Sequence, residues 1–426
     1  MTKLTIDDRF HEKGFQNFED NFTQPRHRWY PFKEGFSSEL VGNAIDSVAN
    51  TIGRALHVLD PFCGSGTTPV AAAVKGHTAH AVEVSPFCAF TARVKCIPKT
   101  WKEGVFTRHL DSITNSAKAD LQPSPLEGQS TFCEGEGKDK WLFNRSVLRA
   151  FDSVWRNAYS NVGPKASIFR LAAMRAAMEC SNAKKDGKAL RYRKDWKKEG
   201  FSDANFFDRF RQAALQFSED MELAPIKKGS RGVIQRGDSR KALSGLPSNS
   251  FDLMVTSPPY LNSFDYSDVY RPELFLGGFV KDNVDLRNVR LRTLRSHVQV
   301  KWGGATDVKS ALLKGPLEQL RDCDSLWNAR IPEMVEAYFH DMRCVLVNAA
   351  RVLKSGAEGW IVVSTSAYGG VHIPVDLILA DLGSQVGMEL KGVYVLRALR
   401  AAGQQQKHFD TEGLPLRESL IVLKKR

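Results

Sequence analysis

The chain has 426 residues, with 60 Lys and Arg against 48 Asp and Glu, which gives a formal net charge of +12. Its 42% hydrophobic and 25% charged content is ordinary for a globular protein, which excludes a disordered, collagen-like or coiled-coil chain. Its seven cysteines form no Cys-x-x-Cys pair, which argues against a disulfide scaffold and a structural zinc site. No apolar run approaches the roughly 20 residues of a membrane helix, and the N-terminus lacks the apolar core of a secretory signal. We therefore expect a cytoplasmic protein without a bound metal, whose excess of cations favours a polyanionic partner.

The first hundred residues are predicted to contain a βαβ unit. An amphipathic helix is expected over 37–48, followed by a buried strand at 55–62. A glycine turn, a helix that ends at Gly76 and a second strand at 78–84 come next. The order strand, glycine turn, helix and strand implies a parallel sheet.

Residues 101–230 lack strand signals and are predicted to form a helical insertion. Two helices are expected between 150 and 180, divided near Gly163 and Pro164, and a third over 205–223. The strand pattern resumes in residues 231–426, with long helices at 332–353 and 374–382. Five strands are predicted there, at 232–238, from 251 into a Pro-Pro turn, at 359–366, at 392–400 and at 418–425. Together with the first two strands they predict a Rossmann-like, seven-stranded, mostly parallel α/β sheet, formed by segments 1–100 and 231–426.

The first candidate site is the turn after the first strand, DPFCGSGTT at residues 60–68. In a doubly wound sheet, ligands bind at the carboxyl ends of the strands. Gly64 and Gly66 let the backbone approach a ligand closely, and the N–H groups that begin the next helix suit an anionic group. Asp60, at the strand end, is placed to hold a cationic amine. Glu83, at the end of the second strand, is placed to accept hydrogen bonds from ribose hydroxyls.

This turn has two interpretations. A Gly-x-Gly turn also occurs in dinucleotide-binding proteins, but their third glycine is missing here because residue 69 is Pro. An acid directly before the turn would repel phosphates, whereas it suits a ligand that carries an amine. S-adenosylmethionine combines an amine, a carboxylate, a ribose and an adenine, and it is the cofactor that we predict.

The second candidate site is TSPPY at residues 256–260. The two prolines have no backbone N–H, so the carbonyls of this turn are left as acceptors that suit a planar –NH2 group. Tyr260 offers a flat face for a heteroaromatic ring, and an amine beside a bound sulfonium needs mainly position for in-line methyl transfer. Pro-Pro-Tyr alone would favour a plain strand-terminating turn. The presence of the glycine turn in the same sheet favours the catalytic interpretation.

Two further residues have open interpretations. Asp238 closes the strand at 232–238, where it could accept from an adenine amino group, cap the next helix, or do both. Cys63 lies in the glycine turn and is expected to be a small packing residue. A cytosine-C5 enzyme would need a nucleophilic cysteine, usually in a Pro-Cys pair, and the sequence has no such pair.

The two motifs resemble a known family. DPFCGSGTT resembles the cofactor motif, and TSPPY the catalytic motif, of the amino-methyltransferases that modify DNA at cytosine-N4 or adenine-N6. Residues 237–260 resemble the segment that leads into the catalytic motif, and HRWYPFKEGF at 27–36 resembles the motif that closes over the cofactor. The resemblance implies a bacterial, archaeal or phage enzyme that transfers methyl from S-adenosylmethionine to a base flipped out of double-stranded DNA. Ser257 as the first catalytic residue favours cytosine-N4 over adenine-N6.

The resemblance assigns roles to residues by their position. The cofactor positions are Asp60, Pro61, Phe62, Cys63, Gly64, Ser65, Gly66, Thr68, Glu83 and Asp238. The catalytic positions are Ser257, Pro258, Pro259 and Tyr260. The chain departs from the commonest arrangement because the glycine motif comes first and a long helical insertion follows it. This departure leaves open which segment recognises the target sequence.

Two basic stretches are candidates for DNA contact, although a solvated surface is the alternative for each. Residues 184–199 have eight cations against three acids and include Tyr192 and Trp196; residues 281–301 have six cations against two acids, with Trp302 beside them. The residues expected to line the base pocket or to contact DNA are Asn262, Asp265, Tyr266, Arg290, Arg292 and Arg295.

Two other functions compete with this prediction. One is an RNA methyltransferase that acts on guanine-N2 or adenine-N6 of tRNA, but the chain shows no candidate for the added RNA-binding domain of those enzymes. The other is a catalytically inactive DNA-binding subunit of a defence complex, which the intact motifs argue against. For the leading prediction the expected partners are double-stranded DNA and a cognate restriction or defence nuclease, and no membrane.

Overall fold

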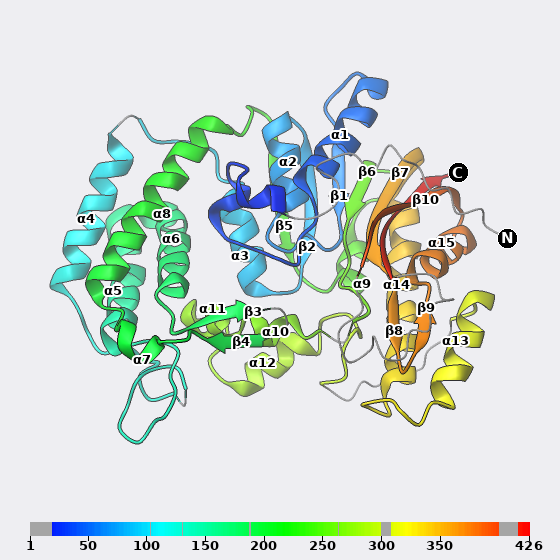
Figure 1. Ribbon diagram of the computed structural model, residues 1–426. Helices are drawn as coiled ribbons and strands as arrows, with labels where there is room; N and C mark the ends of the chain where they lie inside the picture. The colour runs from blue at the N-terminus through cyan, green and yellow to red at the C-terminus, as the bar shows by residue number, and fades with distance from the viewer. Residues whose placement is uncertain are drawn as a thin grey trace.

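A computed structural model describes residues 19–102, 104–129, 131–186, 189–262, 264–299, 308–399 and 416–426. Its centre is a seven-stranded sheet in the order β10-β11-β7-β6-β1-β2-β5 (Figure 1). The strands of this sheet are β1 (His57–Asp60), β2 (Thr78–Glu83), β5 (Arg231–Arg236), β6 (Phe251–Thr256), β7 (Leu353–Ser364), β10 (Met388–Ala398) and β11 (Arg417–Lys425). The predicted fold class is confirmed, because these are the two strands expected early in the chain and the five expected late.

The sheet is parallel except at β11. Strand β1 pairs in parallel with β2 and with β6, and the sheet continues in parallel to β5 on one side and β7 on the other. Strand β11 runs antiparallel to both β7 and β10. Because β1 and β6 are parallel neighbours, the two motifs that follow them emerge at the same edge of the sheet.

Helices cover both faces of the sheet, so most residues of its central strands β1 and β6 are buried. In β1, Val58 faces the cluster formed with α1 (Ser38–Ile52) and α2 (Thr67–Lys75), whereas Leu59 faces the opposite cluster. That second cluster contains α14 (Ile331–Val352) and α15 (Val375–Gln385). All six residues of β6 are buried. The sequence of a strand that is covered on both faces is a continuous apolar run, which is why FDLMV was recognised as a strand.

The helices of residues 105–223 form a group of their own beside the sheet (Figure 1). They are α4 (Val105–Ala119), α5 (Arg145–Val162), α6 (Ala166–Glu179), α7 (Trp196–Glu199) and α8 (Asp203–Leu223). The break between α5 and α6 falls at Gly163, which has φ 59°, and the following Pro164, as predicted. An antiparallel hairpin of β3 (Ala183–Asp186) and β4 (Ala189–Tyr192) interrupts the group. This hairpin has no signal in the sequence, because strands of four residues are too short to show a clear alternation of apolar and polar side chains.

Short elements complete the described part of the chain. Four further helices lie after the TSPPY turn, where the sequence pattern was mixed: α10 (Tyr266–Val269), α11 (Arg271–Leu276), α12 (Asn283–Arg290) and α13 (Ala311–Arg321). The others are α3 (Pro86–Lys95), α9 (Ser239–Ala242), β8 (Ser366–Tyr368), β9 (Val371–Ile373) and the 3-10 helices η2 (Glu19–Phe22), η3 (His27–Trp29), η4 (Gly163–Lys165) and η5 (Leu243–Gly245). Within the described ranges, no helix is both long and apolar enough to cross a membrane.

Candidate active site

A cavity of about 350 Å³ lies where the glycine turn and the TSPPY turn meet. Both Gly64 and Pro258 line it, so the fold brings together two turns that are far apart in the sequence. Of the residues predicted from sequence, the cavity is lined by Pro61, Phe62, Cys63, Gly64, Ser65, Glu83, Asp238, Ser257, Pro258, Pro259, Tyr260, Asn262, Asp265, Tyr266 and Arg292. Asp60, Gly66, Thr68, Arg290 and Arg295 are not among its lining residues.

The glycine turn is held in place by Glu83. Its carboxylate accepts the backbone N–H of Gly64 at 2.9 Å and that of Ser85 at 2.7 Å. Burial raises the pKa of Glu83 from 4.5 to about 7. A carboxylate has about four lone-pair sites, so Glu83 retains acceptor capacity toward the cavity that it lines. This geometry is compatible with the predicted contact to ribose hydroxyls.

Gly66 begins α2 in a conformation that a residue with a side chain rarely adopts. Its φ is 100°, and a Cβ atom there would lie 2.9 Å from both Cα and Cβ of Ala92 in α3. The glycine therefore lets two helices approach each other beside the cavity. Thr68, two residues further along the chain, donates its hydroxyl to the backbone carbonyl of Val255 at 3.2 Å.

Asp60 connects the two turns instead of facing the cavity. Its carboxylate accepts the hydroxyl of Thr256, the first residue of TSPPY, at 2.6 Å and the N–H of Phe62 at 3.0 Å. The residue is completely buried, and burial raises its pKa from 3.8 to about 6. Both contacts use Oδ1, and the buried Oδ2 has no hydrogen-bond partner among the described residues, so the predicted contact with a cationic amine stays a prediction.

The turn after β6 is fixed by a backbone carbonyl of β7 and by side chains of β8 and β11. Ser257 donates its hydroxyl to the backbone carbonyl of Val362 at 3.1 Å. Tyr260 donates its hydroxyl to Glu418 Oε1 at 2.6 Å, and burial raises its pKa well above 10. The carbonyl of Leu261 accepts the hydroxyls of Tyr368, at 3.0 Å, and of Ser366. The turn is therefore preorganised by contacts with three other strands.

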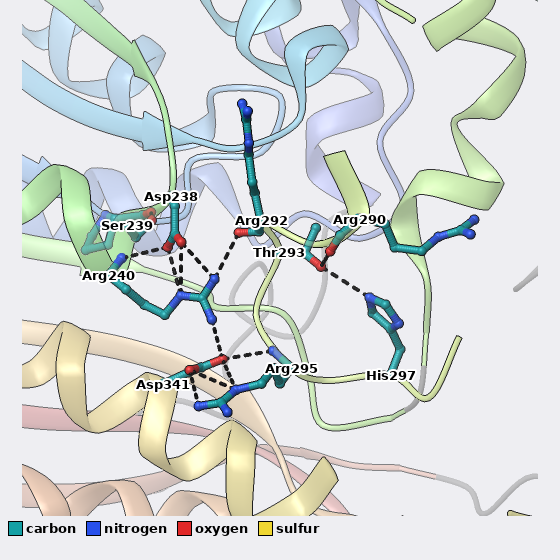
Figure 2. A network of polar contacts seen from close by, with 10 residues as sticks. Asp238, Ser239, Arg240, Arg290, Arg292, Thr293, Arg295, His297 and Asp341 are labelled. Carbon is teal, nitrogen blue, oxygen red and sulfur yellow. Dashed lines mark hydrogen bonds and ion pairs between the residues drawn. The ribbon is translucent and has the colours of Figure 1, made fainter. Parts of the chain in front are cut away.

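Asp238 is both a helix cap and part of a network of charges (Figure 2). It caps α9 by accepting the N–H of Arg240 at 3.0 Å, and the Arg240 guanidinium also contacts both of its oxygens. Arg240 bridges to Asp341 of α14 at 2.8 Å. The capping interpretation is confirmed. Because Asp238 also lines the cavity, a contact with the adenine amino group stays a prediction.

The three arginines of the second basic stretch have different environments. Arg290 forms ion pairs with Asp265 and with Asp268, and its side chain is 16% exposed. Arg295, 8% exposed, binds Asp341 through its side chain and its backbone N–H. Arg292 is exposed and lines the cavity, and its side chain extends away from the network (Figure 2). Of the three, Arg292 is the one whose guanidinium is available for a ligand.

The first basic stretch also divides into inner and outer cations. The Lys185 ammonium lies 3.5 Å from the centre of the Tyr270 ring and pairs with the buried carboxylate of Glu273. Arg193 donates to the backbone carbonyl of Ser181 at 2.8 Å. The exposed cations of this stretch are Lys184, Arg191, Lys194, Lys197 and Lys198. Lys188, Lys301 and Trp302, which were counted in the sequence patterns, lie outside the described residues.

Several lining residues were missed by sequence reasoning. They are Thr293, His297, Arg397 and Glu418, together with Tyr270 from α11. None belongs to a local motif, and each reaches the cavity only through packing of a distant element. Residues 27–36 were noticed in the sequence because they resemble a family motif, and Phe32 and Glu34 of this segment line the cavity. Among the described residues, no cluster of three or more His, Cys, Asp or Glu side chains could hold a metal ion.

Comparisons with known proteins identify relatives that are named methyltransferases. No family model matches the chain. The chain is 27% identical over 450 residues to the type II methyltransferase M.AvaI of Nostoc sp., covering 98% of this chain and 90% of that protein. It is 24% identical over 458 residues to the type II methyltransferase M.BsoBI of Geobacillus stearothermophilus, covering 96% and 87%.

Among solved structures, a SAM-dependent methyltransferase of Methanosarcina mazei matches at 9% identity with a TM-score of 0.30, covering 89% of this chain and 96% of that one. The fold and the curated relatives together support a methyltransferase that uses S-adenosylmethionine.

Proposed function

We propose that the protein transfers a methyl group from S-adenosylmethionine to the exocyclic amine of a base in double-stranded DNA, with cytosine-N4 favoured over adenine-N6. The type II methyltransferase relatives support a DNA methyltransferase. The observation that carries the proposal is the hydrogen bond from Ser257 to the Val362 carbonyl at the wall of the shared cavity. Because the proton of this serine is directed to a carbonyl, the lone pairs of its Oγ are left to accept hydrogen bonds.

An acceptor at this position suits an amine that must become a nucleophile. Ser257 Oγ and the carbonyl of Pro258 would accept the two N–H groups of the base, which draws the nitrogen lone pair out of conjugation with the ring. Tyr260 would hold the ring by stacking. Attack by nitrogen forms an N–C bond, breaks the C–S bond of the sulfonium and leaves S-adenosylhomocysteine, and the extra amine proton passes to water. Position and direction supply the rate acceleration.

The cavity has groups that suit each part of the cofactor. Gly64 has a positive φ of 50°, and its missing side chain leaves room for the Phe32 ring, which would lie 3.1 Å from a Cβ atom at this position. Glu83 offers acceptors to the ribose, and Asp238 lies on the adenine side of the site by the family resemblance. Phe32 and Phe62 supply apolar surface. When bound, the cofactor supplies the methyl group on its sulfonium.

The test is methyl incorporation followed by identification of the product. Purified protein is incubated with S-adenosylmethionine labelled in its methyl group and with duplex DNA, and the digested nucleosides are separated. We expect N4-methylcytosine; N6-methyladenine would correct the base but keep the enzyme class. Label in tRNA and none in duplex DNA would favour the RNA enzyme instead. No transfer to either, with S-adenosylmethionine still bound, would refute the activity.

A matched pair of variants connects the activity to this cavity. Ser257→Ala removes the amine acceptor, whereas Ser248→Ala changes a serine in the loop before β6 that lies outside the cavity lining. We expect Ser257→Ala to lose transfer and Ser248→Ala to keep it. Equal activity of both variants would place the chemistry elsewhere.

A further inference from the structure

The hydroxyl of Tyr260 contacts a charged pair of side chains that comes from β11 and β10, at one edge of the sheet. Glu418 Oε1 accepts this hydroxyl at 2.6 Å. Arg397 donates from Nε to Glu418 Oε2 at 2.8 Å and from a terminal nitrogen to Oε1 at 3.4 Å. Both Glu418 and Arg397 line the cavity. The three side chains form a continuous chain of hydrogen bonds at the cavity wall.

Strand pairing sets this arrangement. Glu418 lies on β11, the antiparallel strand, and it is directly opposite Arg397 of β10 in the register. Its side chain is 8% exposed, and that of Arg397 is 32% exposed. A carboxylate this buried is costly unless it is paired and hydrogen-bonded, and here both oxygens have partners. The pair therefore holds a well-defined acceptor next to Tyr260.

We propose that Glu418 is a positioning residue for Tyr260, and that Arg397 orients Glu418 for this task. The inference rests on the proposed function, in which the Tyr260 ring stacks on the target base. A phenol O–H prefers the plane of its ring, so an acceptor at the tip fixes both the direction of the side chain and the tilt of the ring face. The backbone of the PPY turn alone fixes neither.

Loss of the acceptor has a definite consequence. The Tyr260 hydroxyl would be left buried without its partner, and the side chain would move to find water or another acceptor. A displacement of about 1 Å in a positioned reactant can cost about 100-fold in rate. We therefore expect a decrease in kcat of about 10- to 100-fold, whereas KM for S-adenosylmethionine stays unchanged because Glu83 and the glycine turn are untouched.

The experiment uses four variants and a control in the full chain. Glu418→Ala removes the acceptor, Tyr260→Phe removes the donor, and the double variant removes both. Glu418→Gln keeps an oxygen that can accept the hydroxyl. The control is Glu389→Ala on β10, whose carboxylate pairs with Lys391 and is 52% exposed. Steady-state kcat and both KM values are measured on duplex DNA, together with the melting temperature.

The expected pattern is specific to positioning. Glu418→Ala and Tyr260→Phe lower kcat by similar factors, the double variant is no worse than either, and Glu418→Gln recovers most of the loss. Glu389→Ala behaves like the wild type. If Glu418→Ala fails to fold, Tyr260→Phe and Glu418→Gln still decide the question, because Tyr260→Phe leaves the pair of Glu418 and Arg397 in place and Glu418→Gln keeps one oxygen that can accept the Tyr260 hydroxyl.

Three negative results have to be distinguished. Wild-type kcat in both Glu418→Ala and Tyr260→Phe would overturn the positioning role while leaving the methyltransferase proposal intact. A wild-type protein that transfers no methyl group to DNA would refute the proposed function itself. A fall in melting temperature with kcat unchanged in the folded fraction would mean that the pair only stabilises the sheet, and would also overturn the inference.

Discussion

The substitution Gly66→Ala tests directly how closely α2 and α3 pack beside the cavity. Gly66 has φ 100°, where a residue with a Cβ is disfavoured by about 1–2 kcal/mol. The new Cβ would also lie 2.9 Å from Cα and Cβ of Ala92, and no side-chain rotation can relieve a contact with Cα. Overpacking of this kind costs about 1–3 kcal/mol. We therefore expect a total loss of about 2–5 kcal/mol in the free energy of unfolding.

Gly53→Ala separates the two contributions. Gly53 also has a positive φ, 71°, but nothing lies within 4 Å of the Cβ position. In this control the free energy of unfolding should fall only by the cost of the positive φ, about 1–2 kcal/mol. Urea unfolding of both variants measures the difference, which we expect to be about 1–3 kcal/mol. Binding of S-adenosylmethionine should weaken only in Gly66→Ala, because α2 begins at the cavity with Thr67.

The reasoning would be refuted by an equal loss of stability in the two variants. That result would mean that α2 and α3 can separate without cost at this contact. An unchanged affinity of Gly66→Ala for S-adenosylmethionine would show that the cavity does not depend on the approach of these helices.

The remaining predictions concern charge and catalysis. Ser257→Ala should lower kcat by about 10²- to 10³-fold with an unchanged KM for S-adenosylmethionine, and an equal kcat would contradict the acceptor role. Arg292→Glu should weaken binding to duplex DNA and flatten its dependence on salt while stability changes by less than about 0.5 kcal/mol. Arg295→Glu should instead lower the free energy of unfolding by about 3–5 kcal/mol, because the new carboxylate would face the buried carboxylate of Asp341. Weaker DNA binding without a loss of stability would contradict this prediction. Burial raises the pKa of Glu83 from 4.5 to about 7, so its contribution to stability is present below about 4.5 and lost as pH rises through about 7. Glu83→Gln should flatten that decline in urea unfolding between pH 5 and pH 8, and an unchanged pH profile would rule out this assignment.

The sequence alone determined the sheet and its two functional turns. Apolar runs such as FDLMV and the glycine turn at 60–68 are local patterns, because backbone preferences and burial on a strand act over a few neighbouring residues. The parallel direction of β1 and β2 then followed from the rule that a βαβ unit is parallel, whereas the order of the seven strands came from the structure. The short hairpin β3–β4 was not predicted, because four residues are too few to show the alternation of apolar and polar side chains that is typical of a strand.

Only the tertiary structure decided which side chains are free to act. Arg290, Arg292 and Arg295 are alike in sequence, yet two of them are neutralised by buried carboxylates and one lines the cavity. Glu418 accepts a hydrogen bond from Tyr260, although the two residues are 158 positions apart in the sequence. A charge or a hydrogen bond depends on the partner that folding brings within about 3 Å, and no local pattern records that partner.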